Sequence, residues 1–303
     1  GHSSHVIEVR DLRKEYGGFV AVEGSTFGVD SGEVFGVIGP NGAGKTTTLK
    51  AISGLLEPTS GSVRIGGRRA DSRETRRLLG FLPEESPLYE EMSPRSYLRF
   101  FADLYDVPRD AADRRINETL DRLELAHRDR ALGDMSKGMK RKVAIARSLV
   151  NDPDVLIYDE PASGLDPLTT NYIIEFTKEL AAEGRTVVFS AHNLYHVEEV
   201  CDRVAIMNEG RIVTKGPLSE LRERYGETAY HVFTTVEVPG GTAEGDRYRR
   251  VVDDVDELEA VRAAAIERGG KLDDVRTVEP SLEGLFLDIA SADARTASGT
   301  TGD

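Results

Sequence analysis

Residues 39–47, with the sequence GPNGAGKTT, have the residue types and the spacing needed to bind phosphate. The segment matches Gly-x4-Gly-Lys-[Ser/Thr] at every fixed position. Glycines let successive backbone N–H groups turn toward phosphate oxygens, and a helix that follows adds its positive end to the same anion. A glycine-rich turn that contains a lysine by chance is the alternative. We expect the nucleotide to contact Gly39, Pro40, Asn41, Gly42, Ala43, Gly44, Lys45, Thr46 and Thr47.

The flanks of this segment, called the phosphate loop below, agree with such a site. Residues 34–38 (VFGVI) form a short apolar run typical of a buried strand, and Leu49, Ile52 and Leu56 give the next segment a helical stripe. Lys45 is then expected to reach the β- and γ-phosphates, and the Thr46 hydroxyl to ligate Mg²⁺. The order of strand, loop and helix therefore predicts a nucleotide site.

A second acidic pair follows another apolar run, residues 155–158 (VLIY). This run delivers Asp159 to the carboxyl end of a buried strand, where a carboxylate can hold Mg²⁺. Glu160 is then a candidate base for an attacking water. Two acids that merely open a surface turn before Pro161 are the alternative.

Three further segments complete an ordered set: Met135-Ser136-Lys137-Gly138-Met139, Ser163-Gly164-Leu165-Asp166 and Ser190-Ala191-His192. Ser136 is suited to cap a helix, whose positive end can bind an anion. Together with the phosphate loop and the Asp-Glu pair, this order resembles the ATP-binding-cassette ATPases. The resemblance covers roughly residues 6–224 and is specific, because five ordered elements agree.

The resemblance implies a role for each residue of the hydrolytic site. Lys45, Thr46 and Asp159 would bind phosphate and Mg²⁺, Glu160 would polarise water, and His192 would contact the γ-phosphate. ATP and Mg²⁺ are accordingly the expected ligands.

The resemblance also implies a head-to-tail dimer, either a homodimer or a pair with a related subunit. Each ATP would lie between the phosphate loop of one subunit and Ser136 and Gly138 of the other. Asp166 would lie at the dimer seam, and Tyr16 would stack on adenine.

Several of these residues have plainer alternatives. Tyr16 can instead pack in a β-turn, and Asp166 can cap the helix after Pro167. His192 can be a hydrogen-bonded framework residue, or it can form an i,i+4 metal pair with His196.

The chain departs from the family pattern at Glu84, where the family usually has glutamine. A carboxylate keeps an oxygen for Mg²⁺ or water, so we include Glu84 among the catalytic and metal-site candidates. It loses the amide donor and adds negative charge.

The Ser-x-Gly segment also departs from the commonest sequence of the family, because it has Lys137 and Met139 where the family usually has other residues. For Lys137, Lys140, Arg141 and Lys142 we favour a solvated helix face over a direct phosphate role.

The overall composition and charge of the chain argue against some classes of function. The chain has 303 residues, of which 39% are hydrophobic, and a formal charge of −14, which argues against a general nucleic-acid binder. The acidic surplus fits either a high-salt habitat or a GC-rich genome. No stretch approaches the roughly 18 apolar residues that cross a bilayer, so a transport pore would lie on another chain. The single cysteine, Cys201, fits a reducing compartment.

The expected fold is α/β: a P-loop NTPase with a mostly parallel central sheet and an N-terminal antiparallel β subdomain. We expect the cassette over residues 5–224, with a helical insertion at about 87–150. Residues 225–290 are expected to form a small α+β domain, and residues 291–303 a disordered tail. Within the small domain, residues 230–238 alternate as a strand and residues 256–268 are helical.

The leading hypothesis is an ATPase subunit that dimerises on ATP and drives separate transmembrane permease subunits, as an exporter. It would be cytoplasmic and peripheral on the inner face of the cell membrane. The exporter assignment rests on the departures at Glu84 and in the Ser-x-Gly segment, together with the small domain and its 280–286 ending, which resemble the exporter-type branch. The alternatives are an ATPase of the same family acting on ribosomes or DNA, and an ATP-sensing module without useful hydrolysis.

Overall fold

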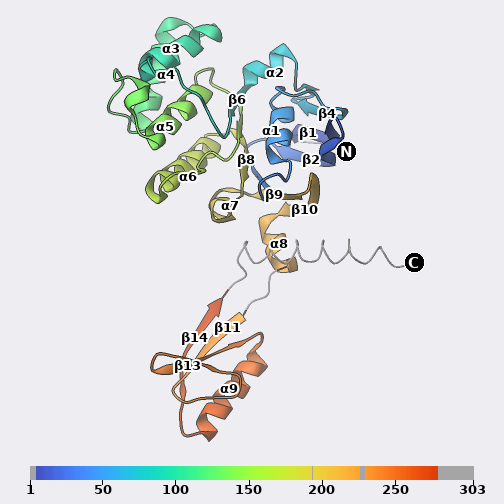
Figure 1. Ribbon diagram of the computed structural model, residues 1–303, viewed down its shortest axis with the longest axis vertical. Helices are drawn as coiled ribbons and strands as arrows, with labels where there is room; N and C mark the ends of the chain where they lie inside the picture. Colours follow the sequence, from blue (N-terminus) through green and yellow to red (C-terminus); the bar gives the residue numbers. More distant parts are fainter. Residues whose placement is uncertain (1–4, 193, 226–228, 279–303) are drawn as a thin grey trace, which may run out of the picture. The chain divides into compact units, whose positions relative to one another are not determined.

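The computed structural model describes residues 5–192, 194–225 and 229–278 (Figure 1). It divides into two compact units, Gly1–Leu218 and Ser219–Asp303. The expected turn at residues 282–286 and the expected tail at 291–303 lie outside the described residues.

The first unit contains two sheets. Their strands are β1 (His5–Tyr16), β2 (Phe19–Asp30), β3 (Val34–Ile38), β4 (Ser60–Ile65), β5 (Arg68–Arg69), β6 (Leu79–Leu82), β7 (Val155–Tyr158), β8 (Thr186–Ala191), β9 (Arg203–Asn208) and β10 (Arg211–Pro217). The antiparallel sheet has the order β2-β1-β4-β5, and the six-stranded sheet has the order β10-β9-β3-β8-β7-β6. Every pairing in the six-stranded sheet is parallel except β9 with β10. The predicted mostly parallel central sheet and antiparallel N-terminal sheet are confirmed.

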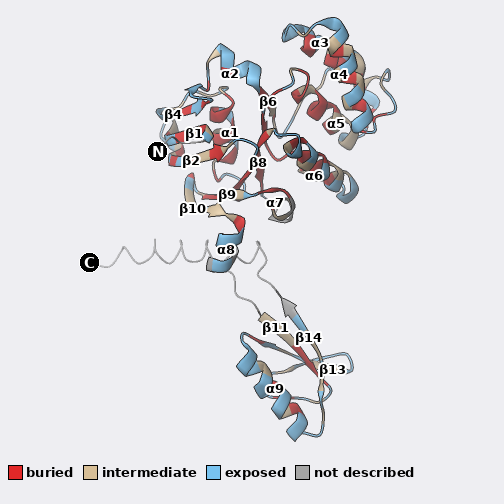
Figure 2. Cartoon of the chain, turned by 180° about the vertical axis from the view of Figure 1, so that it is seen from behind, coloured by how far each residue is buried: buried red, intermediate tan, exposed pale blue. Residues whose placement is uncertain are grey.

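Helices cover both faces of the six-stranded sheet. Helix α1 (Lys45–Ile52) contacts β1, β2 and β4 on one side and β7 and β8 on the other, so it lies between the two sheets. Helix α7 (Leu194–Val200) contacts β3 and β8 on the opposite face, where a Cβ on Gly36 would meet the side chains of Cys201 and Val197. Strands covered on both faces are apolar throughout, which explains why β3, β7 and β8 are wholly buried (Figure 2).

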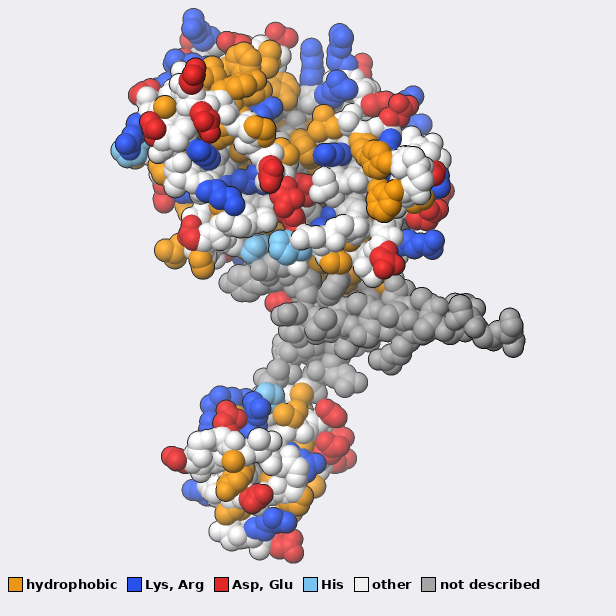
Figure 3. Space-filling model, in the orientation of Figure 1, with side chains coloured by type: hydrophobic (Ala, Val, Ile, Leu, Met, Phe, Trp, Pro, Cys, Tyr) orange, Lys and Arg blue, Asp and Glu red, His pale blue; other side chains and the backbone are white. Residues whose placement is uncertain are grey.

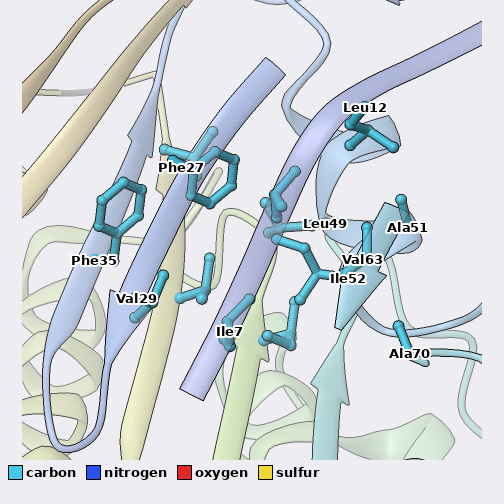
Figure 4. Close-up of a cluster of buried hydrophobic side chains, with 14 of the residues drawn as sticks. Ile7, Leu12, Phe27, Val29, Phe35, Leu49, Ala51, Ile52, Val63 and Ala70 are labelled. Atoms are coloured by element: carbon cyan, nitrogen blue, oxygen red, sulfur yellow. The ribbon is translucent and has the colours of Figure 1, made fainter. Parts of the chain in front are cut away.

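The apolar core of this unit joins the two sheets through α1. Phe27 of β2 and Phe35 of β3 stack with their ring centroids 5.1 Å apart and an interplanar angle of 3°. Leu49 and Ile52 of α1 lie in the same cluster and are fully buried (Figure 4). Burying one such side chain is worth about 1.5–3 kcal/mol. The core therefore fixes α1 and, with it, the phosphate loop at its N-terminus.

The remaining helices of the first unit are α2 (Arg73–Leu78), α3 (Pro94–Leu104), α4 (Arg109–Arg122), the short 3₁₀ helix η1 (Leu132–Asp134), α5 (Lys137–Ser148) and α6 (Pro167–Ala182). The predicted helical insertion is confirmed by α3, α4 and α5. In α3, Tyr97 and Phe101 are buried whereas Phe100 and Leu104 are exposed. No helix among the described residues is long and apolar enough to cross a bilayer.

The boundary between the units falls at α8 (Leu218–Tyr225). The second unit has an antiparallel sheet of order β12-β13-β11-β14. Its strands and helix are β11 (Ala229–Thr234), β12 (Thr242–Glu244), β13 (Arg247–Val252), α9 (Val255–Glu267) and β14 (Leu272–Val278). Val232 and Val252 of the sheet cluster with Val261 and Ala265 of α9.

The strand expected over residues 230–238 was wrong beyond Thr234. There the chain bends, with the Thr234 hydroxyl donating to the Val236 carbonyl and the Thr235 N–H donating to the Lys271 carbonyl. Val236 and Val238 still pack into the small core. Their burial produces the same alternating pattern as a strand, which is why the pattern ran past its end.

We predict that Gly80→Ala destabilises the first unit. A Cβ at this position in β6 would lie 2.1 Å from the Ser148 carbonyl oxygen of α5, so strand and helix must separate. Overpacking of this kind costs about 1–3 kcal/mol, to be read from urea unfolding. Gly18→Ala is the matched control, because a Cβ on Gly18 would have no neighbour within 4 Å. Equal unfolding midpoints for the two variants would contradict the prediction.

Candidate functional site

The phosphate loop connects the buried strand β3 to α1, and two of its glycines are required by space. A Cβ on Gly39 would lie 2.3 Å from the Met207 carbonyl oxygen. Gly44, the residue before α1, has a φ of 101°, and a Cβ there would lie 2.8 Å from the Ala21 carbonyl oxygen. No side chain caps α1, so its first N–H groups remain available to an anion. Within the loop, the Ala43 N–H donates to the Pro40 carbonyl.

Lys45, the first residue of α1, is only 5% exposed. Its ammonium group donates to the Gly39 carbonyl and lies 3.3 Å from Glu160 Oε1. Both predicted phosphate-site residues are therefore in direct contact, although 115 positions separate them in the sequence.

Thr46 and Asp159 also meet, as predicted. The Thr46 hydroxyl donates to Asp159 Oδ2 at 2.9 Å. Ser190, at the end of β8, donates to Asp159 Oδ1 at 2.6 Å and accepts from the Glu160 N–H at 2.9 Å. Ser190 was not predicted as a site residue, since only the position of β8 beside β7 brings it there.

Glu160 is the buried centre of a polar cluster that includes the exposed residues His192 and Glu84. His192 Nδ1 is hydrogen-bonded to Glu160 Oε1, and Glu84, in the loop after β6, lines the same pocket as Glu160. Glu160 has a φ of 42°, in the left-handed region, and is 6% exposed. Non-glycine residues in this region carry a strain of about 1–3 kcal/mol and cluster at functional sites.

The two carboxyl groups have opposite pKa shifts. Burial by itself raises the pKa of Glu160, but the hydrogen bonds from His192 and Glu84 and the charge of Lys45 outweigh it, so the net pKa is lowered. The hydrogen bond to Glu160 raises the pKa of Glu84, and burial and the charges of Glu160 and Asp159 raise it further. Of the two carboxyl groups, Glu84 therefore holds a proton more readily than Glu160.

A pocket of about 380 Å³ opens beside this cluster. It is lined by Phe19, Ala21, Asn41, Gly42, Gly44, Lys45, Thr46, Thr47, Glu84 and Glu160. Tyr16, predicted to stack on adenine, is absent from this lining. Its ring is 49% exposed, with Lys14 Nζ 5.1 Å from the ring centroid. The aromatic residue in the pocket lining is Phe19, which is 66% exposed and which sequence analysis missed.

Gly138 and Asp166 both adjoin Thr169, and neither these two residues nor Ser136 line this pocket. Ser136 caps α5 by accepting from the Met139 N–H, and a Cβ on Gly138 would lie 3.1 Å from the Thr169 side chain. Asp166 caps α6 by accepting from the Thr169 N–H, as one alternative expected, and hydrogen bonds from Thr169 lower its pKa.

The basic run in α5 is not a uniformly solvated face. Lys137 donates to the Gly164 carbonyl, and Lys142 Nζ lies 4.1 Å from the centroid of the Tyr172 ring. For Arg141 the expectation of a solvated side chain was wrong, because it is only 8% exposed. Sequence spacing did not reveal this, since Arg141 lies between the half-buried Lys140 and Lys142 of the same charged run.

The donor set at Thr46 and Asp159 fits a magnesium ion. A hydroxyl and a carboxylate are hard oxygen ligands, and Mg²⁺ commonly completes its shell with substrate phosphates and water. Among the described residues no group of three or more His, Cys, Asp or Glu side chains is arranged to hold a metal. A metal pair of His192 and His196 would thus lack a third ligand within that part of the chain.

Comparisons with known proteins agree on one family. A family model described as ABC transporter matches residues 22–163. Linearmycin resistance ATP-binding protein LnrL of Bacillus subtilis is 31% identical over 96% of this chain and 100% of LnrL. Nod factor export ATP-binding protein I of Burkholderia orbicola is 38% identical over 69% of this chain and 70% of that protein.

Solved structures give the same result. The cbiO1 protein of Clostridium perfringens, described as part of the transporter complex cbiONQ, has a TM-score of 0.66 and 31% identity over 72% of this chain and 91% of that one. A dimeric ATP-binding cassette in a post-hydrolysis state, bound to ADP and Pi, has a TM-score of 0.64 and 25% identity over 70% and 98%. The chain therefore belongs to the ATP-binding proteins of the ABC transporter family, and it is the ATPase subunit of such a transporter.

Proposed function

We propose that this ATPase subunit hydrolyses Mg·ATP as half of a head-to-tail pair and thereby drives separate permease subunits in the outward direction. One observation carries the proposal. Lys45, Thr46 and Glu160 line one pocket, with Asp159 hydrogen-bonded to Thr46, whereas Gly138 and Asp166 both adjoin Thr169 outside this lining. A single subunit would then bind the triphosphate on one side only.

The comparisons support the direction and the partners. Two relatives are named for linearmycin resistance and Nod factor export, and one structural neighbour is described as part of a transporter complex. A further neighbour is a dimer bound to ADP and Pi. By this likeness the subunit would be peripheral at the inner face of the membrane, attached through its permease.

The chemistry follows from the geometry of the cluster. Lys45, with its ammonium group beside Glu160, would bind phosphate oxygens, and Thr46 and Asp159 would hold the magnesium ion. Magnesium, when bound, supplies charge neutralisation on the phosphates. Glu160, kept ionised, would accept a proton from the attacking water. Because His192 Nδ1 contacts Glu160, Nε2 is the atom proposed to contact the γ-phosphate.

Glu160→Gln should lower the kcat for ATP by about 100-fold or more while Mg·ATP still binds, because the amide cannot accept the proton. Turnover is measured by phosphate release, ATP binding by calorimetry, and pairing by size-exclusion chromatography in ATP. Glu85→Gln, at an exposed residue close by, is the control and should turn over normally. A Glu160→Gln variant with wild-type turnover would rule out this base.

Glu84→Gln should preserve turnover at neutral pH, and Glu84→Ala should depress it, because only glutamine retains a side-chain donor toward Glu160. Stability supplies a second measurement. Wild-type Glu84 keeps its proton above the ordinary glutamate pKa of about 4.3, so the folded state binds more protons than the unfolded state and loses stability as pH rises.

In EDTA, the free energy of unfolding of Glu84→Gln should therefore rise relative to wild type between about pH 4 and pH 7. If the free energy of unfolding changed with pH in the same way in both proteins, the raised pKa of Glu84 would be contradicted.

An apolar surface over α3 is the proposed contact with the permease (Figure 3). Tyr89, Phe100, Leu104 and Tyr105 are 54%, 40%, 62% and 44% exposed, and the Tyr89 and Phe100 rings meet edge to face at 5.9 Å. Gathered apolar side chains of this kind commonly mark a protein interface.

Leu104→Ser should weaken co-purification with the permease partner and abolish stimulation of the ATPase by that permease, with basal turnover unchanged. Leu55→Ser is the matched control, because Leu55 is also 62% exposed but follows α1. Equal permease binding by the two variants would place the interface elsewhere.

A further inference from the structure

Arg141 is a buried cation in α5 that is hydrogen-bonded to backbone carbonyls of the hydrolytic site and not to the side chains assigned to phosphate. Its guanidinium donates five hydrogen bonds. They go to the Pro161 carbonyl at 2.8 Å, the Pro83 carbonyl at 2.8 Å, Ser86 Oγ at 3.3 Å, the Asp159 carbonyl at 3.3 Å and the Glu160 carbonyl at 3.4 Å.

The charge of Arg141 can be buried only while the surrounding loops keep the conformation that supplies these acceptors. Burial lowers the pKa of Arg141 to about 10, so the group stays protonated at neutral pH. A buried charge that loses its acceptors is strongly destabilising. The planar fork of a guanidinium also fixes the directions of its acceptors, which a lysine ammonium does not. Any shift of the loops relative to one another would therefore leave donors unpaired.

The backbone that Arg141 holds is the backbone of the reacting carboxylates. Three consecutive carbonyls, those of Asp159, Glu160 and Pro161, accept from it, and the middle residue has the strained φ of 42°. Its remaining bonds hold Pro83 and Ser86 on either side of Glu84, which lines the same pocket as Glu160. Strained residues persist only where neighbouring contacts over-determine them.

We propose that Arg141 is a positioning residue for hydrolysis, which fixes Glu160 in its left-handed conformation and holds the Glu84 loop against it. Arg141 touches neither water nor phosphate in this role and acts through Glu160. The inference thus rests on the proposed role of Glu160 as base and adds the residue that sets its geometry.

The test is a double-mutant cycle on the full chain. Arg141→Lys keeps the charge but loses the fork, and should lower kcat about tenfold or more, because small misplacements of a reacting group are costly. The KM for ATP should change by less than about threefold. Arg115→Lys is the control: Arg115 also donates to a backbone carbonyl, that of Val150, and its loss should leave kcat unchanged.

The same substitution in a Glu160→Gln background distinguishes a positioning role of Arg141 from a general effect on stability. In a Glu160→Gln background, Arg141→Lys should lower the residual single-turnover rate by less than about twofold, because the group through which it acts is already gone. If the two substitutions together lower the rate by the product of their separate effects, or if Arg141→Lys has a wild-type kcat, the inference is overturned. Normal turnover by Glu160→Gln alone overturns the role of Glu160 instead. If Arg141→Lys does not fold, Ser86→Ala, which deletes one acceptor, is taken through the same cycle.

Discussion

Buried charge at the carboxyl edge of the central sheet is the constraint on which the rest of the structure depends. Lys45, Arg141, Asp159 and Glu160 are all less than 9% exposed. Ionised groups withdrawn from water are tolerated only when paired and hydrogen-bonded. Here Lys45 meets oxygen atoms of Gly39 and Glu160, and Arg141 in α5 meets carbonyl oxygens that follow β6 and β7, so these segments must come together before all of the charges are satisfied.

This requirement explains why the apolar core lies where it does. Helix α1 is clamped between two sheets by Leu49 and Ile52, and that clamp brings Lys45 to the end of β7. The middle of β7 and β8 is apolar, and Asp159 and Ser190 appear where these neighbouring strands end. Apolar packing thus stabilises the fold, and the polar contacts fix the positions of the elements around the pocket.

Much of this site could be predicted from sequence because its main signals are local. The phosphate loop has a fixed spacing, and β7 was predicted with its bounds because an unbroken apolar run followed by two acids has few interpretations. Ser190, Phe19 and Arg141 depend on contacts between segments far apart in the chain. Their residue types are ordinary in sequence, and Arg141 even lies in a charged run that favours solvent. The strand over 230–238 failed for a related reason, because burial of Val236 and Val238 imitates strand periodicity.

The lone cysteine offers a practical consequence. Cys201 is packed against Gly36 of β3, and burial raises the pKa of its thiol. A buried neutral thiol reacts poorly with alkylating reagents. A cysteine introduced on the surface would consequently be the one readily labelled position in this sequence, so fluorophores could be attached without first removing the native residue. Opening and closing of the assembled transporter could then be timed by energy transfer, with the nucleotide-binding core left in its natural composition.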